Sequence, residues 1–386
     1  MKIIIDNKIP YIKGALEPFA EVVYLAGNQT TRAAMQDADA LVTRTRTLCS
    51  QENLEGSSVR FIATATIGFD HIDTAYCKAA GIEWANAPGC NAESVNQYIS
   101  SALFSWSIRK GSALKGKTIG IVGVGQVGSR VAKTCEILGM KVLLNDPPRE
   151  RQEGPSQFVS IRTIKKQADI ITFHVPLNMQ GTDRTYHMVD AEFLEDLERK
   201  PLIINTCRGE VFETGAVHQA MAKNEISGMI IDCWENEPEL DLALLDLVDY
   251  GTPHIAGYSK DGKANGTRAS VRAVSRFFRL GIDDWEPSGI DPPGNPLIDL
   301  VRNGQSEESL IAQAVLSTYD IADDDAALRA DTPLFEQLRG DYPVRREFAS
   351  YSIRGVDLDA ATLEKLRELG FAATNRYCEA KSDKSF

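Results

Sequence analysis

The turn Gly123–Gly128 (GVGQVG) constrains the fold more than any other feature of this 386-residue chain. It has the spacing G-x-G-x-x-G, and it stands between an apolar run at Lys117–Val122 and a helical pattern that continues to about Leu138. In this context Gly123 would allow the tight turn, Gly125 would let the backbone approach a pyrophosphate, and Gly128 would let the helix pack close to the strand. The N-terminus of the helix would donate its N–H groups to the phosphates. The turn therefore predicts a dinucleotide-binding α/β domain.

A carboxylate follows the next apolar run at the position that such a domain uses for ribose. Asp146 ends the run Lys141–Asn145 and lies 18 residues after Gly128. A carboxylate at this point would accept hydrogen bonds from the ribose hydroxyls and repel a 2′-phosphate, which favours NAD over NADP. Asp146 also precedes Pro147-Pro148 and could serve as a turn residue, a role that is compatible with ribose binding.

Short β-type runs alternate with helical patterns along most of the chain, as is typical of parallel α/β domains. We expect further strands at Lys2–Asp6, Val22–Leu25, Ala40–Thr43, Arg60–Ala63, Ile82–Ala85, Asp169–Val175, Leu202–Thr206 and Met229–Asp232. Helices are expected at about Glu93–Lys110, Glu213–Lys223 and Lys260–Leu280. We expect the last helix to pack back on the first strands, which would make the first domain discontinuous.

A segment rich in proline and glycine, Trp285–Pro296, separates a C-terminal part from the rest. The tail has mixed elements, including an amphipathic helix at about Ala361–Leu369 that Gly370 would end. We predict a substrate domain at residues 1–93 and 256–285, an NAD-binding domain at 94–255 and a C-terminal domain at 286–386. Because the tail is small for an isolated core, we expect it to need a partner surface.

Composition excludes several classes of function. The net charge of −12 and the pI near 5.1 argue against a nucleic-acid partner, which would require a basic face. The N-terminus has no room for a signal peptide, and no apolar run approaches the roughly 18 residues of a membrane span. We therefore expect a cytoplasmic protein without membrane contact.

The five histidines show no metal-ligand spacing, so no metal is expected. The cysteines are odd in number and form no C-x-x-C pair, which predicts reduced and mostly buried thiols at Cys49, Cys77, Cys90, Cys135, Cys207, Cys233 and Cys378.

Three polar residues, Arg208, Glu237 and His254, each follow the end of an apolar run after the glycine turn. Ligands of a doubly wound sheet bind at the carboxyl ends of its strands. There a guanidinium can hold a carboxylate, and an imidazole near neutrality can take a hydroxyl proton as hydride leaves the carbon. A neighbouring carboxylate would orient the imidazole and stabilise its charged form. Glu235 competes with Glu237 for that role, and their spacing does not decide between them.

The motifs around these residues resemble those of the D-isomer-specific 2-hydroxyacid dehydrogenase family over about residues 1–285. The family's patterns are the glycine turn, N-T-x-R-G at Arg208, E-N-E-P at Glu237 and T-P-H-I-A-G at His254. The resemblance implies a doubly wound Rossmann-type NAD domain inserted in a flavodoxin-like substrate domain. It also implies that Arg208 binds the substrate carboxylate and carbonyl, that His254 is the acid/base and that Glu237, rather than Glu235, is its partner.

The same resemblance implies a set of residues at the NAD site, several of them through backbone groups. These are Gly123, Gly125, Gln126, Val127, Gly128, Asp146, Val175, Thr206, Cys207, Arg208, Asp232 and Gly257.

A second basic motif points to a phosphate on the substrate. The segment Thr43–Thr47 (TRTRT) comes at the end of a predicted strand and offers the guanidinium groups of Arg44 and Arg46 and three hydroxyls, that of Thr45 among them, although an ordinary surface loop would look the same. By resemblance Thr45, Thr66 and Tyr258 also contact substrate. The segments Tyr319–Ile321 and Tyr342–Phe348 resemble the small α+β dimerisation domain of the family branch that oxidises 4-phospho-D-erythronate in pyridoxine 5′-phosphate biosynthesis.

That branch implies a homodimer and oxidation to (R)-3-hydroxy-2-oxo-4-phosphooxybutanoate. Arg345 and Arg346 could then reach the site of a neighbouring subunit. Two alternatives stay open: a phosphoglycerate dehydrogenase or another D-2-hydroxyacid dehydrogenase, and an NADH-sensing, corepressor-like binding protein of the same fold.

Overall fold

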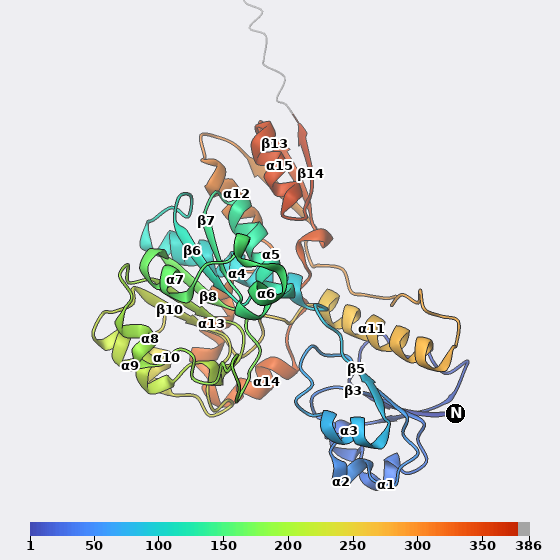
Figure 1. Cartoon of the computed structure of the whole chain (residues 1–386). Coiled ribbons are helices and arrows are strands. Elements are labelled where there is room, and N and C mark those ends of the chain that lie inside the picture. The colour runs from blue at the N-terminus through green and yellow to red at the C-terminus, as the bar shows by residue number, and fades with distance from the viewer. Residues whose placement is uncertain (377–386) are drawn as a thin grey trace, which may run out of the picture. The chain divides into compact units, whose positions relative to one another are not determined.

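A computed structural model describes residues 1–376 and divides the chain into two compact units (Figure 1). The first unit comprises Met1–Glu93 and Tyr258–Asp291, and the second comprises Ser94–Gly257 and the chain from Pro292 onward. Both units are therefore discontinuous in sequence. Cys378 and the last ten residues of the predicted C-terminal domain lie outside the described residues.

The first unit is built on a five-stranded parallel sheet with the order β2-β1-β3-β4-β5. Its strands are β1 (Lys2–Asp6), β2 (Glu21–Leu25), β3 (Ala40–Thr43), β4 (Phe61–Thr64) and β5 (Glu83–Ala85). Alternate residues of β1 face opposite sides, as the pleat of a strand requires. Ile3 and Ile5 join one hydrophobic cluster with Val271 and Val274, whereas Ile4 joins the other. The flavodoxin-like prediction is confirmed.

Helices cover both faces of this sheet. The short helices α1 (Arg32–Met35), α2 (Gln51–Leu54) and α3 (Thr74–Ala80) contribute buried residues to the cluster that contains Ile4. The long helix α11 (Lys260–Phe278) packs on the opposite face and is the orange-yellow helix in Figure 1. It approaches β4 closely, because a Cβ on Gly266 would lie 2.3 Å from the carbonyl oxygen of Ala65. The predicted helix at 260–280 thus packs on the first strands.

The second unit contains a six-stranded parallel sheet with the order β11-β10-β9-β8-β6-β7. Its strands are β6 (Thr118–Val122), β7 (Lys141–Asn145), β8 (Ile170–Phe173), β9 (Leu202–Asn205), β10 (Gly228–Ile231) and β11 (Tyr250–Gly251). Its helices include α4 (Ala92–Lys110), α5 (Gln126–Ile137), α6 (Pro147–Glu153), α7 (Ile161–Gln167), α8 (Ala191–Glu195), α9 (Thr214–Ala222) and α10 (Leu242–Leu247). The chain reverses its direction of winding between β6 and β8, where a doubly wound sheet binds its ligand.

The glycine turn between β6 and α5 has the geometry that the sequence predicts. Gly123 has a φ of +87°, which favours glycine. A Cβ on Gly128 would lie 2.0 Å from the carbonyl oxygen of Gly123, so only glycine lets α5 begin this close to the strand. Around Gly125, by contrast, a Cβ would meet nothing within 4 Å. The backbone at Gly125 is thus open to a ligand.

The C-terminal part of the second unit adds a three-stranded parallel sheet, whose strands we did not place, although the family resemblance implies a small α+β domain here. Its elements are β12 (Leu297–Val301), α12 (Glu307–Leu316), α13 (Ile321–Ala330), α14 (Phe335–Gly340), β13 (Ser352–Val356), α15 (Ala360–Glu368) and β14 (Ala372–Arg376). The predicted helix at 361–369 corresponds to α15. Figure 1 shows β13, β14 and α15 in red.

Helices α13 and α14 attach this C-terminal part to the dinucleotide-binding part of the same unit. Leu328 and Phe335 are buried in its main hydrophobic cluster. Asp325 accepts a hydrogen bond from the backbone of Gly251 on the edge strand β11, and Arg329 donates to carbonyl oxygens of Leu245 and Val248. The surface that the small tail needs is therefore supplied, at least in part, by its own chain.

The hypothesis that Arg345 reaches a neighbouring subunit is wrong. Its guanidinium is buried within the second unit, where only 4% of the residue is exposed. For Arg346 the hypothesis stays a prediction.

Other features of residues 1–376 follow the chemistry of the sequence. Five of the six cysteines in this range are buried, as predicted, and the six form no disulfide with one another. Within the same range no helix is long and apolar enough to cross a membrane. Nor do three or more His, Cys, Asp or Glu side chains gather there as a metal site would require.

The glycine turn yields a paired prediction. We expect Gly128→Ala to lower the free energy of unfolding by about 1–3 kcal/mol, because the new Cβ would collide with a backbone oxygen. Gly125→Ala should change stability much less but weaken NAD binding, because its Cβ would occupy the open side of the turn. Urea unfolding and NAD titration of both variants would test this. Equal stability losses in the two variants would contradict it.

Candidate active site

His254 and Glu237 form a hydrogen-bonded pair in the second unit. The His254 Nδ1 lies 2.5 Å from Glu237 Oε1, and the backbone N–H of Trp234 donates to the other carboxylate oxygen over 3.3 Å. Both side chains are about one-quarter exposed. Burial alone would raise the pKa of Glu237, but the hydrogen bond from His254 and its positive charge lower that pKa below its ordinary value. The carboxylate therefore stays ionised and fixes the tilt of the imidazole.

Glu235 has a different partner, which settles the competition between the two glutamates. Its Oε1 lies 2.6 Å from His187 Nε2, and its Oε2 accepts from the backbone N–H of Thr214. Glu235 and Glu237 thus lie on the same loop but bind different histidines. The pairing of His254 with Glu237 agrees with what the family resemblance implies.

Arg208 follows β9 in a turn that Asn205 organises. The Asn205 amide donates to the carbonyl oxygens of Arg208 and Cys233, and its own carbonyl accepts from the backbone N–H of Cys207. A Cβ on Gly209 would lie 2.0 Å from the backbone of Trp234. These contacts join the Arg208 turn to the loop that carries Glu237. Asn205 is a positioning residue that we did not predict, although it opens the N-T-C-R-G motif.

The backbone at His254 is held in an unusual conformation. His254 has a φ of +54°, in the left-handed region that costs a residue with a side chain about 1–2 kcal/mol. Its N–H donates to the carbonyl oxygens of Asp232 and Thr252. The buried carboxylate of Asp232 then accepts from the hydroxyl of Thr252 (2.7 Å) and the N–H groups of Ile255 (2.7 Å) and Ala256 (3.0 Å). Asp232 therefore supports the His254 turn, and its contact with NAD stays a prediction.

The residues at the carboxyl end of this sheet fit a dinucleotide. Asp146 accepts from the N–H of Val124 in the glycine turn, over 2.8 Å, and from that of Arg149. A Cβ on Gly123 would lie 2.9 Å from Val175, so Val175 borders the turn, while Gln126 and Val127 open α5. The open backbone at Gly125 leaves room for a pyrophosphate, and the N-terminus of α5 offers N–H donors to it. The Asp146 carboxylate, directly after β7, can accept hydrogen bonds from a ribose.

A partly buried histidine lies next to this edge. His174 follows β8, and its ring nitrogens lie 3.1 Å from the hydroxyl of Thr172 and 3.4 Å from that of Thr206. Burial lowers the pKa of His174 to about 3, so the ring is neutral near pH 7. Burial also raises the pKa of Cys207 to about 11, which keeps its thiol protonated. Of the predicted NAD-site residues, Thr206 thus lies beside a neutral imidazole, and Cys207 carries a neutral thiol.

The phosphate candidates lie in the first unit, at the carboxyl end of its sheet. Arg44 follows β3, and its Nε lies 3.3 Å from the buried Asp6, which ends β1. The direction of winding in this sheet changes between these two strands, a position where ligands bind. Thr66 follows β4 and donates its hydroxyl hydrogen to the carbonyl oxygen of Gly68. Thr45 and Arg46 lie in the same loop as Arg44 and are exposed.

Lys263 adds a cation that sequence reasoning missed. Its Nζ lies 4.7 Å from the ring centre of Tyr258, one of the predicted substrate residues. Burial and the positive charges of Lys260 and Arg44 lower the pKa of Lys263. A cation that is partly buried beside other cations is suited to an anionic ligand. No local signal in the sequence distinguishes Lys263 from a surface lysine on α11.

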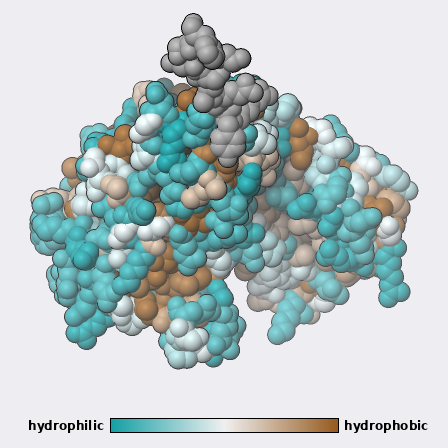
Figure 2. All heavy atoms as spheres, turned by 90° about the horizontal axis from the view of Figure 1, so that it is seen from above, coloured by the Kyte–Doolittle hydropathy of each residue, from teal (hydrophilic) through white to brown (hydrophobic). Residues whose placement is uncertain are grey.

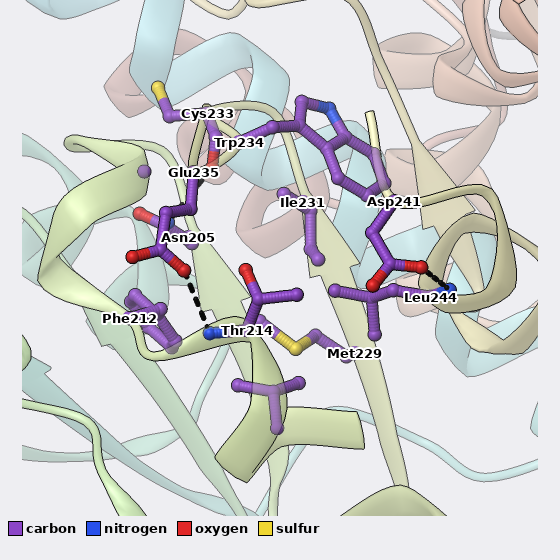
Figure 3. Close-up of a pocket in the computed structure, with 12 residues that line it drawn as sticks. Asn205, Phe212, Thr214, Met229, Ile231, Cys233, Trp234, Glu235, Asp241 and Leu244 are labelled. Carbon is purple, nitrogen blue, oxygen red and sulfur yellow. Dashed lines mark hydrogen bonds between the residues drawn. The ribbon is translucent and has the colours of Figure 1, made fainter. Parts of the chain in front are cut away.

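A small pocket is lined in part by the loop that carries Glu235 (Figure 3). Figure 3 shows the Glu235 carboxylate bonded to Thr214 and the Asp241 carboxylate bonded to the N-terminus of α10 at Leu244. The lining includes Gly209 and Trp234 but not Arg208, Glu237 or His254. The pocket is therefore distinct from the candidate active site.

Comparisons with known proteins agree with this geometry. Residues 91–256 match the family described as D-isomer specific 2-hydroxyacid dehydrogenase, NAD binding domain, and residues 293–370 match a Domain of unknown function (DUF3410). The erythronate-4-phosphate dehydrogenase of Bacteroides thetaiotaomicron is 54% identical over 92% of this chain and 100% of its own. The enzyme of the same name from Porphyromonas gingivalis is 40% identical over 96% of this chain and 100% of its own.

Solved structures show the same fold over a shorter range. A D-lactate dehydrogenase from Aquifex aeolicus, complexed with NAD and lactic acid, is 25% identical with a TM-score of 0.60, over 73% of this chain and 97% of its own. An NAD⁺-bound 3-phosphoglycerate dehydrogenase from Entamoeba histolytica is 24% identical with a TM-score of 0.62, over 75% of this chain and 99% of its own. The glycine turn, the paired His254 and Glu237 and the near-full-length similarity together lead to one conclusion: the chain belongs to the erythronate-4-phosphate dehydrogenase family, within the D-isomer-specific 2-hydroxyacid dehydrogenases.

Proposed function

We propose that this chain catalyses the NAD-dependent oxidation of 4-phospho-D-erythronate at C2, as a cytoplasmic enzyme of pyridoxine 5′-phosphate biosynthesis. The product would be (R)-3-hydroxy-2-oxo-4-phosphooxybutanoate. The observation that carries the proposal is the 54% identity to an erythronate-4-phosphate dehydrogenase over that relative's whole length. The polar residues at the strand ends supply groups suited to each part of the reaction.

His254 is the proposed general base. Its Nδ1 faces Glu237, so its Nε2 is the nitrogen that would take the proton from the O2 hydroxyl. Glu237 would hold the ring in this orientation and stabilise the imidazolium that forms. The proton therefore moves onto a base whose charged state is already balanced by a neighbouring carboxylate.

Arg208 is the proposed carboxylate ligand. Its planar guanidinium can bind the C1 carboxylate through two parallel hydrogen bonds and polarise the C2 oxygen as it becomes a carbonyl. NAD, held by the glycine turn and Asp146, would supply the hydride acceptor. Val175, Thr206, Cys207 and Gly257 would border it, and the protonated thiol of Cys207 would add no charge beside the nicotinamide.

The cations of the first unit are the proposed phosphate ligands. Arg44, Arg46 and Lys263 would give charge-assisted hydrogen bonds, with the hydroxyls of Thr45, Thr66 and Tyr258 as further partners. The net charge of −12 does not oppose this assignment, because local cations determine the field at a small site.

Two other functions would be distinguished by simple measurements. A 3-phosphoglycerate dehydrogenase would also use a phosphate loop, and the similarity to such a structure makes it the nearer alternative. An NADH-sensing binding protein would capture a partner without oxidising hydroxy acids. Parallel assays with 4-phosphoerythronate and 3-phosphoglycerate separate all three, because the proposal requires a much higher kcat/KM for the first substrate.

We further propose that the chain forms a homodimer through its C-terminal sheet. On β12, Ile298 and Leu300 point into the core, whereas Leu297 and Val301 are 40% and 46% exposed. Figure 2 shows a face on which hydrophilic residues predominate and brown hydrophobic residues lie in small groups. Exposed apolar residues on a sheet face are suited to a self-complementary interface.

The base is tested by comparing two histidines that both bind a glutamate. We expect His254→Ala to lower kcat by about 10²–10⁴-fold while NAD binding survives, because only the proton acceptor is lost. His187→Ala removes the imidazole from the Glu235 pair and should leave kcat nearly unchanged. Steady-state kinetics and NAD titration give the answer. Turnover near that of the wild type in His254→Ala would refute the mechanism.

The carboxylate partners provide a matched pair of the same kind. Glu237→Gln should reduce kcat, because a neutral amide no longer balances the imidazolium, whereas Glu235→Gln should have little effect on turnover. Equal losses of kcat in the two variants, measured under the same conditions, would remove the special role of Glu237.

The phosphate site is tested with Lys263→Met. Loss of one hydrogen bond to a charged group costs about 1.5–3 kcal/mol, so the KM for 4-phosphoerythronate should rise by about 10- to 100-fold. The KM for unphosphorylated D-erythronate should not change. The exposed Lys78 on α3 serves as the control in Lys78→Met. An unchanged KM for the phosphorylated substrate would exclude Lys263 from the site.

The dimer is tested with a charged residue on β12. We expect Val301→Arg to yield a monomer of about 42.4 kDa in light scattering after size-exclusion chromatography. Leu247 on α10 is exposed to a similar extent, at 43%, and Leu247→Arg should leave the dimer intact. A Val301→Arg variant that remains a dimer would place the interface elsewhere.

A further inference from the structure

Arg345 lies in the irregular segment between α14 and β13 and is almost completely buried. A buried guanidinium needs hydrogen-bond acceptors, because its desolvation is costly. Its Nε donates to the side-chain oxygen of Gln97 over 3.0 Å, and its Nη2 donates to the carbonyl oxygen of Ser94. Its carbon Cζ lies 4.1 Å from the ring centre of Tyr319, an attractive cation–π contact.

The remaining hydrogen bonds of Arg345 reach the segment that follows the proposed base. Nη1 donates to the carbonyl oxygen of Ile255 over 3.2 Å, and Nη2 donates to that of Ala256 over 2.9 Å. These are the two residues directly after His254. A side chain of the C-terminal part therefore touches the backbone that carries the proposed base.

Asp232 binds the other polar groups of the same two residues. Its carboxylate accepts from the N–H groups of Ile255 and Ala256, while Arg345 binds both carbonyl oxygens. All four backbone polar groups of this dipeptide are thus bound by two buried side chains of opposite charge. His254 stands immediately before it with a φ of +54°, a conformation that persists only where the surroundings impose it.

We propose that Arg345 is a positioning residue for the reaction: it fixes the backbone of Ile255 and Ala256 and so keeps the imidazole of His254 against Glu237. The planar fork of arginine is essential to this role, because lysine cannot span Gln97 and both carbonyl oxygens at once. The C-terminal part would then be required for catalysis as well as for association. This inference rests on the proposed function of His254.

The test compares Arg345→Lys with a second arginine of the same kind. Arg329 also lies in the C-terminal part and donates to two backbone carbonyl oxygens, but these belong to Leu245 and Val248, nine and six residues before His254, and not to the dipeptide directly after it. We expect Arg345→Lys to lower kcat by about 10- to 100-fold, with NAD affinity and oligomeric state unchanged, because a shift of about 1 Å in a catalytic group has such an effect. Arg329→Lys should lower stability without changing kcat.

A second readout distinguishes positioning from a general loss of structure and does not depend on activity. In histidine-labelled protein, NMR should show the imidazoles of His254 and His187, each bonded to a glutamate, with His254→Ala assigning the former. Arg345→Lys should shift or broaden the His254 signal and leave that of His187 unchanged. If the wild-type protein lacked dehydrogenase activity, the proposed function would fail, while the NMR comparison would still decide on Arg345.

Either of two results would overturn the inference: an Arg345→Lys variant with wild-type kcat and an unchanged His254 signal, or equal effects of Arg345→Lys and Arg329→Lys on kcat. If Arg345→Lys does not fold, Gln97→Met replaces it, because it removes one acceptor of the fork and leaves the cation in place. The same kcat and NMR criteria then apply to Gln97→Met.

Discussion

The buried carboxylate of Asp232 is the interaction on which the rest of the candidate site depends. It lies at the end of β10 and binds the hydroxyl of Thr252 and two successive N–H groups after His254. Through Thr252 it is linked to the buried Tyr98 of α4, whose hydroxyl lies 2.7 Å away from that of Thr252. Desolvation raises the pKa of Asp232 above its ordinary value. That rise is opposed by the charge of His254 and by the hydrogen bonds from Thr252, Ala256 and Ile255. This carboxylate thus binds the N–H groups of the turn that presents the imidazole, opposite the carbonyl oxygens that Arg345 binds.

The parts of the fold that the sequence predicted are those with a local signal. β3 and β7 match their predicted bounds because short apolar runs end at polar residues. The glycine turn matches because Gly123 and Gly128 have steric reasons to be glycine, while Gly125 leaves the backbone open. The strands β12 to β14 were missed because their alternation is short and lies among polar residues. Asp232 and Arg345 bind the backbone directly after His254, and they lie 22 residues before and 91 residues after it, so no spacing rule could reveal these contacts.

The two glutamates of the E-N-E-P motif show what geometry adds to spacing. Both lie beside histidines at hydrogen-bond distance, and either pair alone would look like a catalytic dyad. The Glu235 pair borders a loop that also binds the N-terminus of α9 through Thr214, which gives it a structural task. The Glu237 pair lies beside a turn in a left-handed conformation. The contrast supports the use of His187 and Glu235 as internal references for His254 and Glu237.

The interleaved order of the two units has a consequence for how the protein is made. Neither unit is continuous: the first needs residues 258–291 to complete its core, and the second needs residues beyond 292. During synthesis, the dinucleotide-binding strands therefore emerge before the helices that cover Leu245 and Val248, and Arg345 leaves the ribosome about 90 residues after the dipeptide that it binds. Domains generally fold from the N-terminus as the chain emerges. In this protein the turn that carries His254 cannot receive its last backbone partners until Arg345 has been synthesised, so a chain that stops before Arg345 would have the residues for chemistry without the contacts that hold them.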